Sequence, residues 1–200
     1  MPRSKEDWMA EGLKVLAESG VSGLTIDALS SRLGLTKGSF YHHFKDVQDY
    51  HEQLITYWAD QYLSTADSYP QDAFAGLELL DNIMNRIFKP ITEPEVAIRN
   101  WAHENNMVRS YVEEVEKARH GFVLHAFQMV TKETDQALLM ADMLSTIMLG
   151  SMTSLPRIPT QRVLELYQEF KRLYGLMDLQ LKSVDEIVSP AEGNTKEHSE

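Results

Sequence analysis

The sequence predicts an all-α protein of about nine helices, with three short N-terminal helices followed by a larger helical body. Apolar residues recur at spacings of three and four along most of the chain, and no segment alternates β-branched with polar residues. Proline is absent between Arg3 and Tyr69, so nothing in that stretch forbids helices. A chain of 200 residues is long enough for a small domain joined to a larger one with its own core.

The first helix is expected from about Ser4 to Ser19. Met9, Leu13 and Leu16 follow one another at spacings of four and three, which places them on one side of a helix. Gly20 is expected to end this helix, because glycine is common just beyond a helix C-terminus.

Three further helices follow at short intervals. Thr25 is the expected N-cap of the second helix, which Gly34 closes, and Thr36 is the expected N-cap of a short third helix. Asp46 is expected to cap a fourth helix that reaches about residue 65. The fourth helix has apolar residues on more than one side, so we expect it to contact both the first three helices and the body. These residues are Tyr50, Leu54, Ile55, Trp58 and Tyr62.

The body is predicted from five longer apolar patterns and the prolines between them. The expected segments are 77–88, stopped by Pro90; 93–105, opened by Pro94; 108–129; 138–148, ended near Pro156; and 163–177, capped by Thr160. Residues from about Ser183 onward are polar, and we expect a disordered tail over 183–200.

Composition indicates a cytoplasmic protein. The chain contains no cysteine, which excludes disulfides and thiolate metal sites and fits a reducing compartment. The N-terminus lacks the apolar core of a signal peptide, and the longest charge-free stretch, 143–156, is too short to span a bilayer.

The net charge of −11 is distributed unevenly. Residues 1–46 hold six Lys and Arg against six Asp and Glu, so the rest of the chain carries the whole excess of negative charge. A neutral N-terminal segment on an acidic body permits nucleic-acid binding at one end only, because the body would be repelled by phosphates.

Only Gly34 and Leu35 separate the second and third helices, which is typical of a helix-turn-helix motif. The second helix of such a motif lies in the DNA major groove with its N-terminal residues nearest the bases. Gly38 would let the backbone approach closely, and Phe40 and Phe44, four residues apart, would anchor the helix in a core.

The stretch LTIDALSSRLGLTKGSFYHHFKD resembles the N-terminal domain of the TetR family of transcriptional regulators, over about residues 4–65. The resemblance implies a homodimeric repressor that binds a palindromic operator and is released by a small-molecule effector. It implies a DNA-binding domain at 1–46, a connecting helix at 46–65, and an effector-binding and dimerisation domain at 47–182. The DNA-contacting residues it implies are Thr25, Thr36, Lys37, Gly38, Ser39, Tyr41, His42, His43 and Lys45. The chain departs from many relatives at Val47, where they carry a Lys that contacts phosphate.

Aromatic residues and methionines in the body supply two further sets of candidates. The expected effector-pocket residues are Met84, Phe88, Trp101, His103, Met107 and Phe122, which favour an apolar or aromatic ligand. The expected dimer-interface residues are Met148, Met152, Tyr167, Phe170 and Tyr174. No cofactor and no metal are expected.

Two alternatives remain open at this stage. One is an effector-binding or adaptor protein without specific DNA binding, and the other is a helical-bundle enzyme that uses His103, Glu104, Glu116 and His120. No spacing among these four supports a catalytic site, so we predict that the protein is not an enzyme. Glu116 and His120, four residues apart, are interpreted as a surface ion pair. His42 and His43 point about 100° apart and would not share a metal ion.

Overall fold

The computed structural model describes residues 4–63, 72–88 and 94–176, and every regular element within them is helical. The all-α prediction is confirmed. The helices are α1 (Lys5–Ser19), α2 (Ile26–Leu33), α3 (Lys37–Tyr41), α4 (Val47–Leu63), α5 (Ala73–Phe88), α6 (Pro94–Glu104), α7 (Asn106–Val130), α8 (Thr134–Thr153) and α9 (Thr160–Leu173), with a 3₁₀ helix, η1 (Val21–Gly23), after α1.

Side-chain caps set the N-termini of the first four helices, much as the sequence predicts. The Oγ1 atom of Thr25 accepts a hydrogen bond from the Ala28 N–H at 3.1 Å, and an Asp46 carboxylate oxygen accepts from the Asp49 N–H at 2.8 Å. Gly34 ends α2 in the left-handed conformation, with φ of +68°.

Two local predictions were wrong or incomplete. Thr160 is the first residue of α9 rather than its cap, and Pro159 occupies the cap position without a side-chain hydrogen bond. The 3₁₀ turn η1 carries no apolar periodicity that would have revealed it. The expected tail over 183–200 and Met177 lie outside the described residues.

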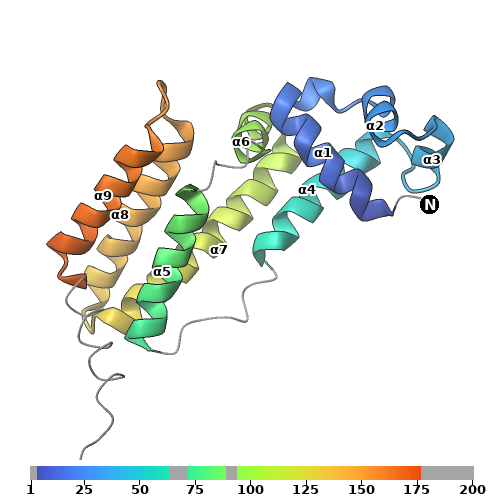
Figure 1. Cartoon of the computed structure of the whole chain (residues 1–200). Coiled ribbons are helices and arrows are strands. Elements are labelled where there is room, and N and C mark those ends of the chain that lie inside the picture. The colour runs from blue at the N-terminus through green and yellow to red at the C-terminus, as the bar shows by residue number, and fades with distance from the viewer. Residues whose placement is uncertain (1–3, 64–71, 89–93, 177–200) are drawn as a thin grey trace, which may run out of the picture.

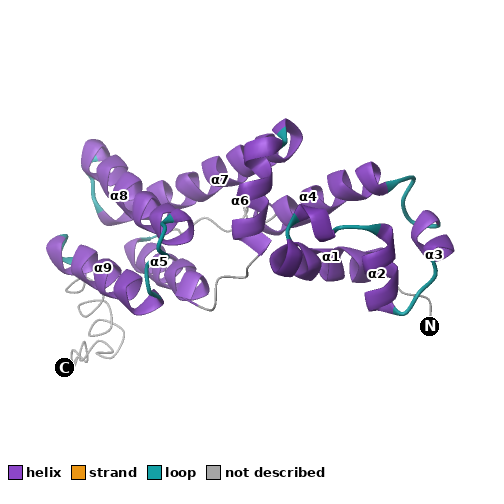
Figure 2. Ribbon diagram, turned by 90° about the horizontal axis from the view of Figure 1, so that it is seen from above, coloured by secondary structure: helices purple, strands orange, loops and turns teal. Residues whose placement is uncertain are grey.

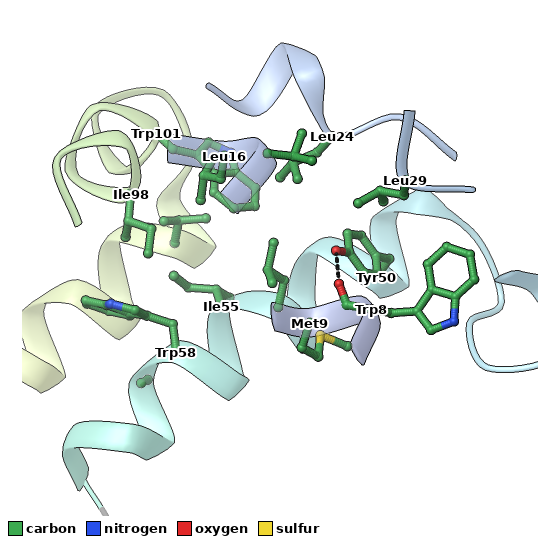
Figure 3. Close-up of a cluster of buried hydrophobic side chains, with 14 of the residues drawn as sticks. Trp8, Met9, Leu16, Leu24, Leu29, Tyr50, Ile55, Trp58, Ile98 and Trp101 are labelled. Atoms are coloured by element: carbon green, nitrogen blue, oxygen red, sulfur yellow. Dashed lines mark hydrogen bonds between the residues drawn. The ribbon is translucent and has the colours of Figure 1, made fainter. Parts of the chain in front are cut away.

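The N-terminal core is built from aromatic rings. Phe40 and Phe44 are almost completely buried, and both meet the indole of Trp8 edge-on, with ring centroids 5.5 and 6.2 Å away. The buried Tyr50 hydroxyl donates to the Trp8 carbonyl at 2.9 Å (Figure 3). A side chain at Gly12 would meet that hydroxyl oxygen at 1.8 Å, so only glycine allows α4 to approach α1 this closely.

The same core continues from the N-terminal helices into the body. Figure 3 shows Trp58 of α4 and Ile98 and Trp101 of α6 in one cluster with Tyr50 and Trp8. Helices α4, α6 and α7 therefore lie between α1–α3 at one end of the molecule and α8–α9 at the other (Figures 1 and 2).

A second core fills the space between α5, α7, α8 and α9. Phe127 of α7 meets Phe170 of α9 with ring centroids 5.8 Å apart, and Leu80 and Leu144 are buried beside them. Asp81 of α5 accepts hydrogen bonds from the Tyr167 hydroxyl at 2.7 Å and the Lys171 ammonium at 3.0 Å, which holds α9 on α5. Within the described ranges, no helix has the length and apolar character needed to cross a bilayer.

His51 of α4 lies in the shared core, where its ring meets Trp101 edge-on at 5.1 Å. Its Nε2 is buried without a hydrogen-bond partner. Burial lowers the pKa of His51 below its usual 6.5, and the opposing effect of a hydrogen bond to the Leu24 backbone is smaller.

We predict that His51 makes the fold less stable at acidic pH. Because its pKa is lower in the folded state, the unfolded chain binds the proton first, so stability is present above pH 6.5 and is lost as the pH falls below it. The free energy of unfolding should fall by at most about 1.4 kcal/mol per pH unit from this group. Urea unfolding between pH 7.5 and 5 should show a smaller slope of the unfolding free energy against pH for His51→Phe than for wild type, while Gln128→Ala, at an exposed position without an ionisable group, should leave that slope unchanged. Equal slopes in all three proteins would contradict this role.

Candidate nucleic-acid interface

Helix α3 projects from one end of the molecule, remote from α8 and α9 (Figure 2). It has only five residues, and Phe40 and Phe44 attach it to the core, as predicted. The remaining side chains of residues 36–45 lie at the surface or partly buried. The fold therefore presents a short polar helix whose orientation is set by two buried rings.

The predicted contact residues lie together at this end. Tyr41 is 57% exposed, which is unusual for so large a side chain, and its ring leans edge-on against Phe40 at 5.6 Å. Thr25, Thr36, Lys37, Gly38, His42 and Lys45 are exposed, and Ser39 and His43 are partly buried. Contact with DNA by any of them stays a prediction.

Thr36 and Gly38 shape the N-terminus of α3. Thr36 Oγ1 accepts from the Ser39 N–H at 3.4 Å and lies 3.4 Å from the Ser39 hydroxyl, where either oxygen can donate. A Cβ atom at Gly38 would meet only Thr36 Oγ1, at an ordinary distance of 3.6 Å. Packing within the chain therefore does not require glycine at this position, which fits a need for close approach by another molecule.

Some basic side chains near α3 form ion pairs with carboxylates of the protein itself. Lys37 Nζ lies 2.6 Å from an Asp27 carboxylate oxygen, and this hydrogen bond raises the pKa of the Lys37 ammonium. Arg32 instead joins α2 to α1, at 2.6 Å from Glu11 and 2.5 Å from Glu18. Sequence counting could not separate such structural cations from free ones. Nothing in the sequence indicated that the Asp27 carboxylate lies beside the predicted contact residues.

Lys5 is a further residue that sequence reasoning did not single out. Its ammonium lies 6.0 Å from the centroid of the Phe44 ring, so α1 brings a cation next to the C-terminal side of α3. Val47, the first residue of α4, is 36% exposed, and a lysine in its place would extend the same cationic surface.

Four of the six predicted effector residues have described side chains. Trp101 and Met107 pack in or against the shared core, His103 is exposed, and Phe122 is partly buried on α7. Met84 and Phe88 belong to α5, but their side chains lie outside the described residues. Their role in effector binding stays a prediction.

The predicted interface residues lie mostly inside the protomer. Met148, Met152, Tyr167 and Phe170 are each at most 8% exposed, and the Tyr174 hydroxyl lies 3.1 Å from the sulfur of Met143. The apolar residues that α8 turns outward are instead Leu138, Leu139, Met143 and Leu149, all at least 37% exposed.

The interpretation of Glu116 and His120 as an ion pair was wrong. Glu116 binds Arg99 at 2.6 Å and Arg119 at 2.9 Å, whereas His120 Nε2 lies 2.8 Å from Asp142 of α8. Glu116 thus pairs with arginines on α6 and on its own helix, and His120 pairs with a carboxylate on α8. In the part of the chain that the structure describes, no three His, Asp or Glu side chains converge as a metal site would require.

The short connection between α2 and α3 and the exposed, ring-anchored α3 form a helix-turn-helix motif. Residues 9–49 match the family model described as bacterial regulatory proteins, tetR family. Over these residues the chain is similar to the N-terminal helices of the TetR family.

Two solved structures share its fold. A candidate transcriptional regulator from Pseudomonas aeruginosa PAO1 is 14% identical, with a TM-score of 0.57 over 86% of this chain and 89% of the other. A candidate transcriptional regulator from Streptomyces coelicolor A3(2) is 15% identical, with a TM-score of 0.50 over 83% of this chain and 96% of the other. No curated protein matches the sequence.

We predict that Asp27→Asn strengthens DNA binding by about fivefold at 0.1 M salt, because it removes a negative charge from the contact surface and releases Lys37. The dependence of log K on log salt should steepen by about one unit. Fluorescence anisotropy across a salt series measures both quantities. Asp135→Asn, an exposed position on α8, is the matched control. Weaker binding by Asp27→Asn would instead show that Asp27 holds Lys37 in its DNA-contacting position.

Proposed function

We propose that the protein is a homodimeric repressor in the cytoplasm that binds a palindromic operator and releases it when a small molecule binds the helical body. The observation that carries the proposal is α3, where exposed polar residues surround a helix fixed by buried Phe40 and Phe44. The N-terminal residues of α3 would face the bases, and Thr25, Tyr41 and His43 would contact phosphates.

The outer face of α8 supports a dimer. Leu139 and Met143 follow one another on this helix and are 54% and 37% exposed. Gly150 continues the same stripe, and a Cβ atom there would meet nothing within 4 Å, so the protomer itself leaves room for a partner helix. A row of exposed apolar residues beside a small one is suited to helix–helix association.

Dimerisation would place two copies of α3 about 34–36 Å apart, one helical turn of DNA. A ligand releases such a dimer only if it prefers the conformation in which that spacing is wrong. Moving the population from mostly bound to mostly free requires a preference on the order of 5 kcal/mol. Because α4 packs against α1 on one side and against α6 and α7 of the body on another, it is the element through which such a change would pass.

The operator is testable by selecting genomic fragments at one stated salt concentration. We expect a palindromic site, with affinity reduced about tenfold or more by Lys37→Ala and by Tyr41→Ala. Lys132→Ala, between α7 and α8, should bind like wild type. A protein that dimerises but enriches no fragment would favour the adaptor function without specific DNA binding.

The dimer is testable by sedimentation. Leu139→Glu should weaken self-association at least tenfold, because a carboxylate would be buried between two apolar faces. The Gln128→Glu substitution adds the same charge at an exposed position of α7, and this variant should remain dimeric. As dimerisation is lost, operator affinity should also fall, because the two half-sites are then bound independently. An unchanged sedimentation coefficient for Leu139→Glu would place the interface elsewhere.

A further inference from the structure

An exposed ion pair joins the first turn of α2 to the first residue of α3. Lys37 Nζ lies 2.6 Å from an Asp27 carboxylate oxygen, and the two side chains are 61% and 74% exposed, respectively. Both helices lie at the end of the molecule that is remote from α8 and α9 (Figure 2). A carboxylate and an ammonium group therefore project side by side from the surface that the proposed function places on DNA.

Local structure accounts for little of this pair. The N-cap of α2 is Thr25, whose Oγ1 accepts from the Ala28 N–H, so the Asp27 carboxylate is not needed as a cap. Lys37 is the first residue of α3, where the helix dipole disfavours a positive charge. Exposed ion pairs also contribute little to stability, because water solvates both ions when they separate. Contact with another molecule gives a better reason for holding two opposite charges at this point.

Each member of the pair has hydrogen-bonding capacity beyond its contact with the other. A carboxylate offers two oxygens with about four lone-pair sites, and an ammonium group has three N–H donors. The contact between Lys37 and Asp27 uses one donor and one acceptor site, so the pair can still donate and accept at once. It matches a surface that presents a donor and an acceptor within hydrogen-bond distance of each other.

A base pair presents such a surface in the major groove of DNA. Within a C·G pair, cytosine N4 donates to guanine O6 over about 2.9 Å, which is close to the 2.6 Å between Lys37 Nζ and the Asp27 oxygen. Carboxylates accept from cytosine N4, and lysine donates to guanine O6 and N7. One C·G pair therefore offers a partner to each side chain at the spacing that the two side chains already have.

The same chemistry disfavours the other base pairs. With guanine facing Asp27, the O6 and N7 acceptors of guanine would repel the carboxylate. With adenine there, the N6 amino group suits Asp27, but adenine N7 repels it and thymine O4 is the single acceptor left for Lys37. With thymine there, the carboxylate meets the O4 acceptor and a methyl group. Only cytosine facing Asp27 gives each charge its complement.

We infer that Asp27 and Lys37 act as one unit that reads a single C·G base pair in each operator half-site, with cytosine facing Asp27 and guanine facing Lys37. Asp27 is not among the predicted contact residues, and this role makes it a residue that determines specificity. The role rests on the proposed binding of an operator, and it specifies one base pair within that operator.

Selection from a library of random half-sites, at one stated salt concentration, tests the joint reading. Asp27→Ala and Lys37→Ala should each make the same C·G position degenerate, because each removes half of one recognition unit, while the other selected positions persist. In wild type, exchanging that pair for A·T should weaken binding about tenfold, and exchanging it for G·C should weaken binding more. Asp135→Asn removes an exposed carboxylate on α8 and should keep the full preference. Relaxation at two different positions, or at none, would overturn the joint reading.

Asp27→Asn separates base reading from the general effect of charge. Asparagine keeps an oxygen that accepts from cytosine N4 and adds a donor, a combination that suits adenine N6 and N7. The variant should therefore bind the C·G operator at least as tightly as wild type, but bind the operator with adenine at that position at least as tightly as the C·G operator. The ratio of two affinities within one variant does not depend on its overall gain in affinity. An unchanged preference for C·G would rule out base reading by Asp27.

Replacing the guanine with 7-deazaguanine, which lacks the N7 acceptor, tests the contact of Lys37. Wild type should bind this operator about fivefold more weakly, whereas Lys37→Ala should bind both operators equally. A loss of the same size in Lys37→Ala would overturn the contact.

The outcomes separate this reading from the proposed function. If wild type selects a palindrome but no position is relaxed by both alanine substitutions, the reading fails and the regulator stands. If the C·G preference behaves as expected but the adjoining gene is not repressed, the reading stands and the repressor function fails. If wild type selects no sequence at all, both fail.

Discussion

The rest of the structure depends on the burial of α4 on more than one side. Tyr50 at its start is enclosed by Trp8 and Phe44, and Trp58 further along lies in the cluster that Ile98 of α6 completes. A helix held in this way cannot shift against one partner without disturbing the other, because close-packed side chains leave no empty space between them. The position of α3 relative to the body is therefore set by α4. This constraint is also the physical reason that a ligand in the body could affect the DNA-binding end.

Two basic residues near the proposed DNA-contacting end of this acidic chain are paired locally. Arg32 is used inside the N-terminal domain, where Glu11 and Glu18 neutralise it, and Lys37 shares its charge with Asp27. In the proposed function, hydroxyl groups, the Tyr41 phenol and backbone N–H groups at the start of α3 would carry much of the contact surface. Such donors position a protein on DNA with less dependence on salt than a row of lysines would produce.

The body shows why periodicity alone misassigns faces. Helix α8 is apolar on almost every side: Met148 and Met152 face the core, while Leu139 and Met143 face outward. A pattern of apolar residues on such a helix predicts that it is helical but not which stripe meets which neighbour. Trp101, predicted to line an effector pocket, meets the ring of His51 edge-on, and its role in effector binding stays a prediction. Charged residues were equally ambiguous, because Glu116 found its partners on α6 and one turn along α7.

The sequence by itself determined the helices, most of their caps and the motif around α3. These features depend on interactions within a few residues, such as Thr25 with Ala28 or Phe40 with Phe44, so they can be read from spacing. The fold was needed to show which cations are paired within the chain and which side of α8 is exposed. Those properties arise from side chains that are distant in the sequence, and their pairing depends on the competition among all partners that the folded chain brings within reach.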